Sequence, residues 1–122
     1  GKQKYLEDMC KILFSPVTFQ QNGEIIKITL DLMLKATDEV LIQTLEAMAE
    51  REETCSILSA IKIPAMVLCG EHDILTPPEK SEYMQQQIPG SVLHVIANSG
   101  HLAHLENKDA FNQHLNNFLK SF

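Results

Sequence analysis

This sequence of 122 residues lacks tryptophan, is poor in aromatic residues, and has no long apolar run. No stretch approaches the roughly 20 apolar residues that a membrane-spanning helix needs, so we expect no membrane partner. Basic residues are also scarce: 10 lysines and arginines face 16 aspartates and glutamates, for a formal net charge of −6. An acidic chain repels phosphate backbones and anionic lipids, which excludes nucleic acid as an expected partner.

The sequence also lacks a complete set of cysteine pairs and the close cysteine spacing that is typical of zinc sites. Three cysteines cannot all pair within one chain, and Cys10, Cys55 and Cys69 are too far apart in sequence for a C-x-x-C zinc site. We interpret them as reduced thiols packed in the core of a cytoplasmic protein. With 44% hydrophobic and 21% charged residues, the composition is that of a globular domain.

The first residue is glycine rather than methionine, and the opening residues contain no apolar signal region. We therefore expect either an expression scar or a chain cut from a longer protein.

The first half of the chain is predicted to be helical, because its apolar residues recur at helical spacing. Ser15-Pro16 ends the first helix, and Thr37-Asp38 caps a later one that runs to about Arg51. A short helix is expected over 55–61. The apolar side chains of these helices are expected to pack as a core.

The pattern changes at Ile63-Pro64. Short apolar runs at 65–69 and 92–96 predict strands that are buried on both faces. Helices are expected over 78–88 and 107–122. This order predicts an α/β fold: a βαβα unit with parallel strands and a right-handed crossover. Two strands are too few for a doubly wound sheet, so we interpret the unit as the end of a larger one.

A carboxylate and an imidazole follow the two predicted strands. Asp73 comes shortly after the first strand and His101 shortly after the second. Loops at the carboxyl ends of parallel strands share one edge of the sheet, so the two side chains are expected to meet. A carboxylate that accepts the Nδ1–H of a histidine fixes its tautomer and leaves Nε2 as a general base.

These residues stand in two longer motifs, I-P-A-M-V-L-C-G-E-H-D-I-L-T-P-P and N-S-G-H-L-A-H-L-E. Together they resemble the last third of an α/β-hydrolase, and the 28 positions between aspartate and histidine are typical of that family. The resemblance implies that Asp73 is the triad acid and His101 the triad base. Glu106 matches the acidic residue that commonly follows, which is expected to be a structural partner for the loop backbone.

Residues 1–62 resemble the helical cap that these enzymes insert before the acid strand. The stretch A-M-A-E-R at 47–51 is similar to one in 3-oxoadipate enol-lactonases and small esterases. The resemblance thus divides the chain into a helical cap segment, 1–62, and the C-terminal βαβα part of the hydrolase core, 63–122. We interpret Arg51 as a solvated or ion-paired cap residue, with binding of a substrate carboxylate as the alternative.

The nucleophile elbow G-x-S-x-G of this family is missing. The family order is serine, then acid, then histidine. Only Ser15, Ser56 and Ser59 precede Asp73, and none is flanked by glycines. The glycine-bearing oxyanion loop is absent too. We therefore expect the nucleophile to lie on sequence outside these residues and this C-terminal fragment to be inactive alone.

The parent protein is expected to be a cytoplasmic serine hydrolase for a small ester, lactone or related carbonyl substrate, with no metal or organic cofactor. Three alternatives stay open. An aspartate nucleophile would make it an epoxide hydrolase or haloalkane dehalogenase. The chain could instead be a non-enzymatic, self-associating module. A metal site is the third, and its ligands would be His72, Asp73, His101 and His104, a set without the closed N/S pattern of zinc.

Self-association is expected from the strand at 64–69. One side of it has no predicted neighbour, and an unpaired edge invites pairing with another chain. We predict a homo-oligomer, most simply a two-fold dimer, formed through Ala65 to Cys69 or by exchange of the segment 1–62. The alternative is a monomer in which the helices cover that edge.

Overall fold

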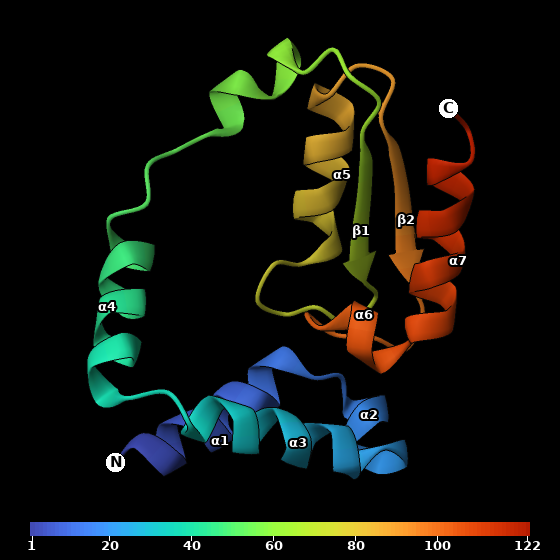
Figure 1. Ribbon diagram of the computed structural model, residues 1–122. Coiled ribbons are helices and arrows are strands. Elements are labelled where there is room, and N and C mark those ends of the chain that lie inside the picture. Colours follow the sequence, from blue (N-terminus) through green and yellow to red (C-terminus); the bar gives the residue numbers. More distant parts are fainter.

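The computed structural model describes residues 1–122 as a helical segment followed by a strand–helix–strand–helix unit (Figure 1). The helical segment contains four α-helices and one 3-10 helix: α1 (Lys2–Leu13), α2 (Pro16–Gln21), α3 (Gly23–Leu34), α4 (Asp38–Ala49) and η1 (Cys55–Ala60). The second unit contains β1 (Met66–Gly70), α5 (Pro78–Gln87), β2 (Val92–Ile96), α6 (Ala103–Glu106) and α7 (Lys108–Leu119). None of these helices combines the length and apolarity needed to cross a bilayer.

The helix boundaries follow local turn and capping residues: Ser15-Pro16 comes after the end of α1, as predicted, and also begins the short α2, which was not predicted. Ser15 accepts a hydrogen bond from the Thr18 N–H as the N-cap of α2, with Pro16 in the first turn. Thr37 caps α4 in the same way. The final helix predicted over 107–122 is confirmed as α7, which Asn107 caps by accepting from the Ala110 N–H, whereas the short α6 before it was not predicted.

The two strands are parallel, as predicted, and pair in register from Met66 opposite Val92 to Gly70 opposite Ile96. α5 makes the connection between them and packs against both strands, whereas α7 packs on β2. The stacked rings of His94 and His114, with centroids 4.0 Å apart, form part of the α7 contact.

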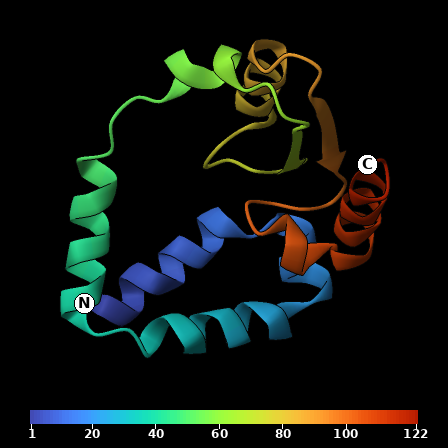
Figure 2. The ribbon, with the colours of Figure 1, turned by 45° about the horizontal axis from the view of Figure 1, so that its top comes forward.

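The helical core is smaller than the apolar periodicity predicts. Cys10, Phe14 and Ile26 form a buried cluster between α1 and α3, whereas α4 buries no residue. Leu45 is 46% exposed and Met48 is 63% exposed, so the prediction that the apolar face of α4 packs in a core is wrong for this helix. Figure 2 shows the reason: α4 lies apart from the sheet, joined to η1 by an extended link.

The cysteines are free, but only two of the three are buried. Cys10 and Cys69 lie in the interior, where burial raises the pKa of both thiols. A protonated thiol is a poor nucleophile, so neither is an activated cysteine. The prediction of a buried thiol is wrong for Cys55, which is exposed because η1 buries no residue.

One edge of β1 has no strand beside it. On its paired side, Ala65 O accepts from the Val92 N–H at 3.1 Å, and the Glu71 N–H donates to Ile96 O at 2.9 Å. Because alternate residues of a strand bond to opposite sides, the backbone groups of Met66 and Leu68 point to the other edge. A groove of about 810 Å³ adjoins that edge, with Val67, Leu68, Tyr83 and Met84 among its walls.

We propose that the isolated chain forms a two-fold dimer through this edge. An antiparallel copy centred on Val67 places Met66 of one chain opposite Leu68 of the other, so that each satisfies the free N–H and C=O of its counterpart. Light scattering is expected to give about twice the monomer mass of 13.7 kDa. Leu68→Pro, which removes an edge donor, is expected to give monomers.

Val95→Pro is the matched control, because Val95 bonds away from β1 on the opposite edge of the two-stranded sheet. Circular dichroism would check that both variants stay folded. A folded wild-type monomer at micromolar concentration, or equal dissociation of the two variants, would contradict the proposal.

Candidate active site

Asp73 lies in the loop after β1 and is 5% exposed. Its Oδ1 accepts from the N–H groups of Leu75 (3.0 Å) and Thr76 (2.9 Å), which closes a turn around the carboxylate. Its Oδ2 accepts from the Thr76 hydroxyl at 2.9 Å. The turn therefore holds Asp73 with one oxygen still directed toward the neighbouring loop.

His101 supplies the other half of the site. Its Nδ1 lies 2.9 Å from Asp73 Oδ2. The Thr76 hydroxyl is 3.3 Å from the same nitrogen. Because that hydroxyl donates to Asp73, the arrangement requires Nδ1 to carry a proton and donate it to the carboxylate. Nε2 then carries the lone pair, and no group of the chain bonds to it, while the side chain stays 33% exposed.

Two glycines let the loops approach each other. A Cβ on Gly70 would lie 2.0 Å from the carbonyl oxygen of Gly100, and one on Gly100 would lie 2.8 Å from Leu13 O. The His72 N–H donates to Ser99 O at 2.8 Å across the same contact. A larger side chain at 70 would separate the loops that carry Asp73 and His101, and one at 100 would push the His101 loop away from residues 13–15.

Hydrogen bonds decide the charge of Asp73. Burial by itself would raise the pKa of its carboxyl, but the bonds from the Thr76 N–H, from His101 and from the Thr76 hydroxyl outweigh it and hold the pKa below its usual 3.8. Asp73 is therefore ionised at neutral pH and can orient the imidazole and stabilise an imidazolium.

The structure thus brings together the two residues that the sequence singled out. Glu106 contacts the loop backbone as expected, accepting from the Gly100 N–H at 2.8 Å. The sequence analysis missed the role of Thr76, although an aspartate followed three positions later by threonine is a turn signal that could have indicated it. No group of three or more histidine, cysteine or acidic side chains is arranged to hold a metal ion.

The serines do not complete the pair. Ser15 is fully buried, and its hydroxyl donates to Asn98 O at 2.8 Å instead of to His101. Ser56 and Ser59 lie on the exposed η1. No nucleophile from this chain is therefore hydrogen-bonded to His101 Nε2.

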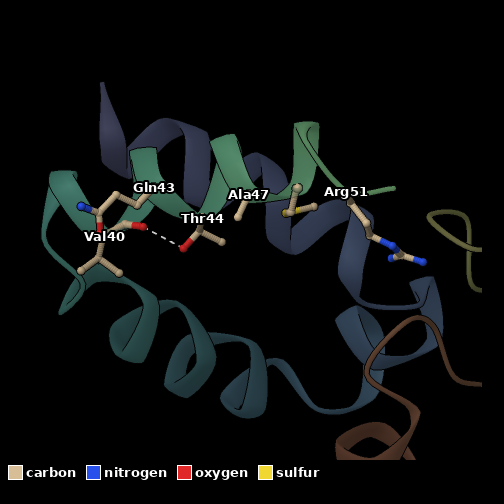
Figure 3. Close-up of a pocket in the computed structure, with 6 residues that line it drawn as sticks. Val40, Gln43, Thr44, Ala47 and Arg51 are labelled. Atoms are coloured by element: carbon tan, nitrogen blue, oxygen red, sulfur yellow. Dashed lines mark hydrogen bonds between the residues drawn. The ribbon is translucent and has the colours of Figure 1, made fainter. Parts of the chain in front are cut away.

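Two grooves share Arg51, and one of them adjoins the site. The groove beside β1 includes Leu75 and Thr76 of the Asp73 turn as well as Arg51. A second groove, of about 430 Å³, follows one face of α4 from Val40 to Arg51 (Figure 3). Arg51 forms no ion pair within the chain, as expected for a solvated residue.

Comparison with known proteins agrees with this arrangement. The family model described as "alpha/beta hydrolase fold" matches residues 14–108. The chain belongs to the α/β-hydrolase family. Its solved relatives include a thermophilic esterase from Thermogutta terrifontis, 31% identical, which superposes with a TM-score of 0.94 over 99% of this chain and 44% of that one.

Two further similar proteins show how widely the similarity extends. A pimeloyl-[acyl-carrier protein] methyl ester esterase from Neisseria meningitidis is 33% identical over 90 residues, which are 74% of this chain and 34% of that protein. An enol-lactonase from Burkholderia xenovorans LB400 is 21% identical with a TM-score of 0.89, over 98% of this chain and 45% of that one, and shows the fold alone. The chain therefore spans less than half the length of these relatives.

Replacing Asp73 tests the carboxylate directly. Asp73→Asn is expected to lower the free energy of unfolding by about 1–3 kcal/mol at pH 7, because a buried acceptor of several donors becomes an amide. Since the folded pKa of Asp73 is depressed, its stabilisation is present above pH 3.8 and is lost as the pH falls through the folded value. Urea denaturation should therefore show a difference in unfolding free energy between the wild type and Asp73→Asn at pH 7, and this difference should disappear in acid.

The control is Asp109→Asn, at an exposed aspartate in the first turn of α7. It is expected to cost less than about 1 kcal/mol at pH 7. Equal losses of unfolding free energy in Asp73→Asn and Asp109→Asn would mean that the Asp73 hydrogen bonds stabilise the fold no more than an exposed aspartate does.

Proposed function

We propose that this chain supplies the acid and the base of a serine-type hydrolase that cleaves a small ester, lactone or related carbonyl substrate. The observation that carries the proposal is the Asp73–His101 pair, joined at 2.9 Å with Nε2 of the imidazole free. The names of the similar proteins, two esterases and an enol-lactonase, support the substrate class.

In this mechanism a serine hydroxyl from sequence outside these 122 residues lies against His101 Nε2. As the serine attacks the carbonyl carbon, His101 takes its proton and then gives it to the leaving alcohol. His101 next removes a proton from water, which attacks the acyl-enzyme, and returns this proton to the serine oxygen as the acid leaves. Asp73 stays ionised throughout and holds the imidazole in the required tautomer.

The two parts of the chain take different roles in this proposal. Residues 63–122 belong to the core that carries the catalytic pair, and residues 1–62 form the cap over the substrate. The exposed apolar face of α4 supports a cap role, because it offers apolar side chains without burying them. We place the enzyme in the cytoplasm, and the chemistry requires no metal or organic cofactor.

An aspartate nucleophile is compatible with the same pair. Asp73 and His101 would then activate the water that hydrolyses the ester formed on that aspartate. The esterase and lactonase names among the relatives favour serine. The non-enzymatic alternative treats the isolated chain as a self-associating module without catalysis, and it is compatible with a longer protein that is an enzyme.

The isolated chain is expected to hydrolyse p-nitrophenyl acetate no faster than its His101→Ala variant, because it has neither the serine nor the donors that stabilise an oxyanion. The longer gene product that contains this chain is expected to hydrolyse the ester. There, His101→Ala should reduce kcat by roughly 10⁴-fold or more.

His104→Ala is the matched control, because His104 is an exposed histidine that lies outside the pair. A His101-dependent burst of nitrophenol from the isolated chain would show that the nucleophile lies within it. A longer product whose activity is indifferent to His101 would overturn the proposed function.

A further inference from the structure

A second buried network lies behind His101, centred on Glu106. The Glu106 carboxylate accepts three hydrogen bonds from two distant parts of the chain. Oε1 accepts from the Gly100 N–H at 2.8 Å, while Oε2 accepts from the Ser15 N–H at 2.8 Å and the Thr18 hydroxyl at 2.7 Å. One carboxylate therefore joins the loop that precedes His101 to the junction of α1 and α2.

Two more bonds join the same segments directly. The Ser15 hydroxyl donates to Asn98 O at 2.8 Å, and the His101 N–H donates to Leu13 O at 2.8 Å. A Cβ on Gly100 would also lie 2.8 Å from Ser15 N, so the backbones are in contact. The α1–α2 junction and the histidine loop are thus held as one unit, with Glu106 at its centre.

We infer that Glu106 is a positioning residue that couples the docking of the α1–α2 junction to the placement of the His101 imidazole. The coupling runs through the backbone, because Gly100 bonds to Glu106 and His101 follows it immediately. The Nδ1–Oδ2 distance is 2.9 Å, so a shift of about 1 Å in this loop would carry the pair beyond hydrogen-bonding range. The link to catalysis rests on the proposed function, whereas the link to imidazole geometry does not.

The residue type fits this role. All three partners of Glu106 are donors, and an ionised carboxylate is an acceptor at both oxygens. A glutamine in the same place would direct its own NH₂ group at Gly100 or at Ser15 and Thr18. Charge-assisted bonds of this kind are also stronger than those between neutral groups. Loss of the carboxylate should therefore release one of the two segments.

The chain provides a matched control in Glu71. Its carboxylate accepts from the Asn98 N–H at 3.0 Å, on the same loop, but it has no bond to the α1–α2 junction. Glu71→Gln and Glu106→Gln remove the same charge and each removes a backbone acceptor of this loop. Only the second breaks the connection to Ser15 and Thr18.

The test uses NMR of the 122-residue chain. In the wild type and in Glu71→Gln, His101 is expected to show a downfield Nδ1–H proton and nitrogen shifts of a single tautomer. In Glu106→Gln, that proton should broaden or disappear, the tautomers should mix, and the amides of Gly100 and Ser15 should exchange at least 10-fold faster. Thr18→Val, which removes one donor and leaves the carboxylate, should give a smaller change in the same direction and keeps the test usable if Glu106→Gln fails to fold.

An unchanged His101 signal in folded Glu106→Gln, or an equal change in Glu71→Gln, would overturn the inference. In the longer hydrolase, Glu106→Gln is expected to lower kcat by about 10- to 100-fold with KM changed less than about twofold, since a small misplacement of the base affects the chemical step. NMR changes without an effect on kcat would overturn only the catalytic link, and an inactive wild type would count against the proposed function instead.

Discussion

The parallel pairing of β1 with β2 is the constraint on which the rest of this structure depends. It brings the ends of both strands to one edge, where the Glu71 N–H bonds to Ile96 O and the His72 N–H to Ser99 O. Gly70 allows the backbones of these two loops to touch. Asp73 and His101 are 28 positions apart in the chain, and their contact at 2.9 Å follows from this backbone arrangement.

Two carboxylates then organise the loops, and both act as acceptors surrounded by donors. Asp73 gathers the N–H groups and hydroxyl of its own turn together with the imidazole, so its contacts are mostly local. Glu106 instead gathers donors from segments far apart in sequence. The first sets the tautomer of His101, and the second ties its loop to the helical segment. The site thus depends on groups from both parts of the chain.

Sequence reasoning succeeded where the cause is local. Ser15-Pro16 follows the end of α1, as predicted, and Thr37 caps α4 because its side chain reaches a backbone N–H within one turn. Apolar runs bounded by turn residues predicted both strands. The sequence reasoning failed on α4. The apolar residues of this helix have the spacing of a buried face, although no residue of the helix is buried. Periodicity shows which face of a helix is apolar, but it does not show whether another element covers that face.

The sequence by itself determined the order of the longer elements, the Thr37 cap, and the pair Asp73 and His101, because turn chemistry and the family motifs are local properties of the chain. Only the tertiary structure decided that Ser15 bonds to Asn98 O and that Glu106 joins the His101 loop to the junction of α1 and α2. These contacts join residues up to 91 positions apart. Distances of that kind are set by how the elements pack in three dimensions, which no local pattern of residues specifies.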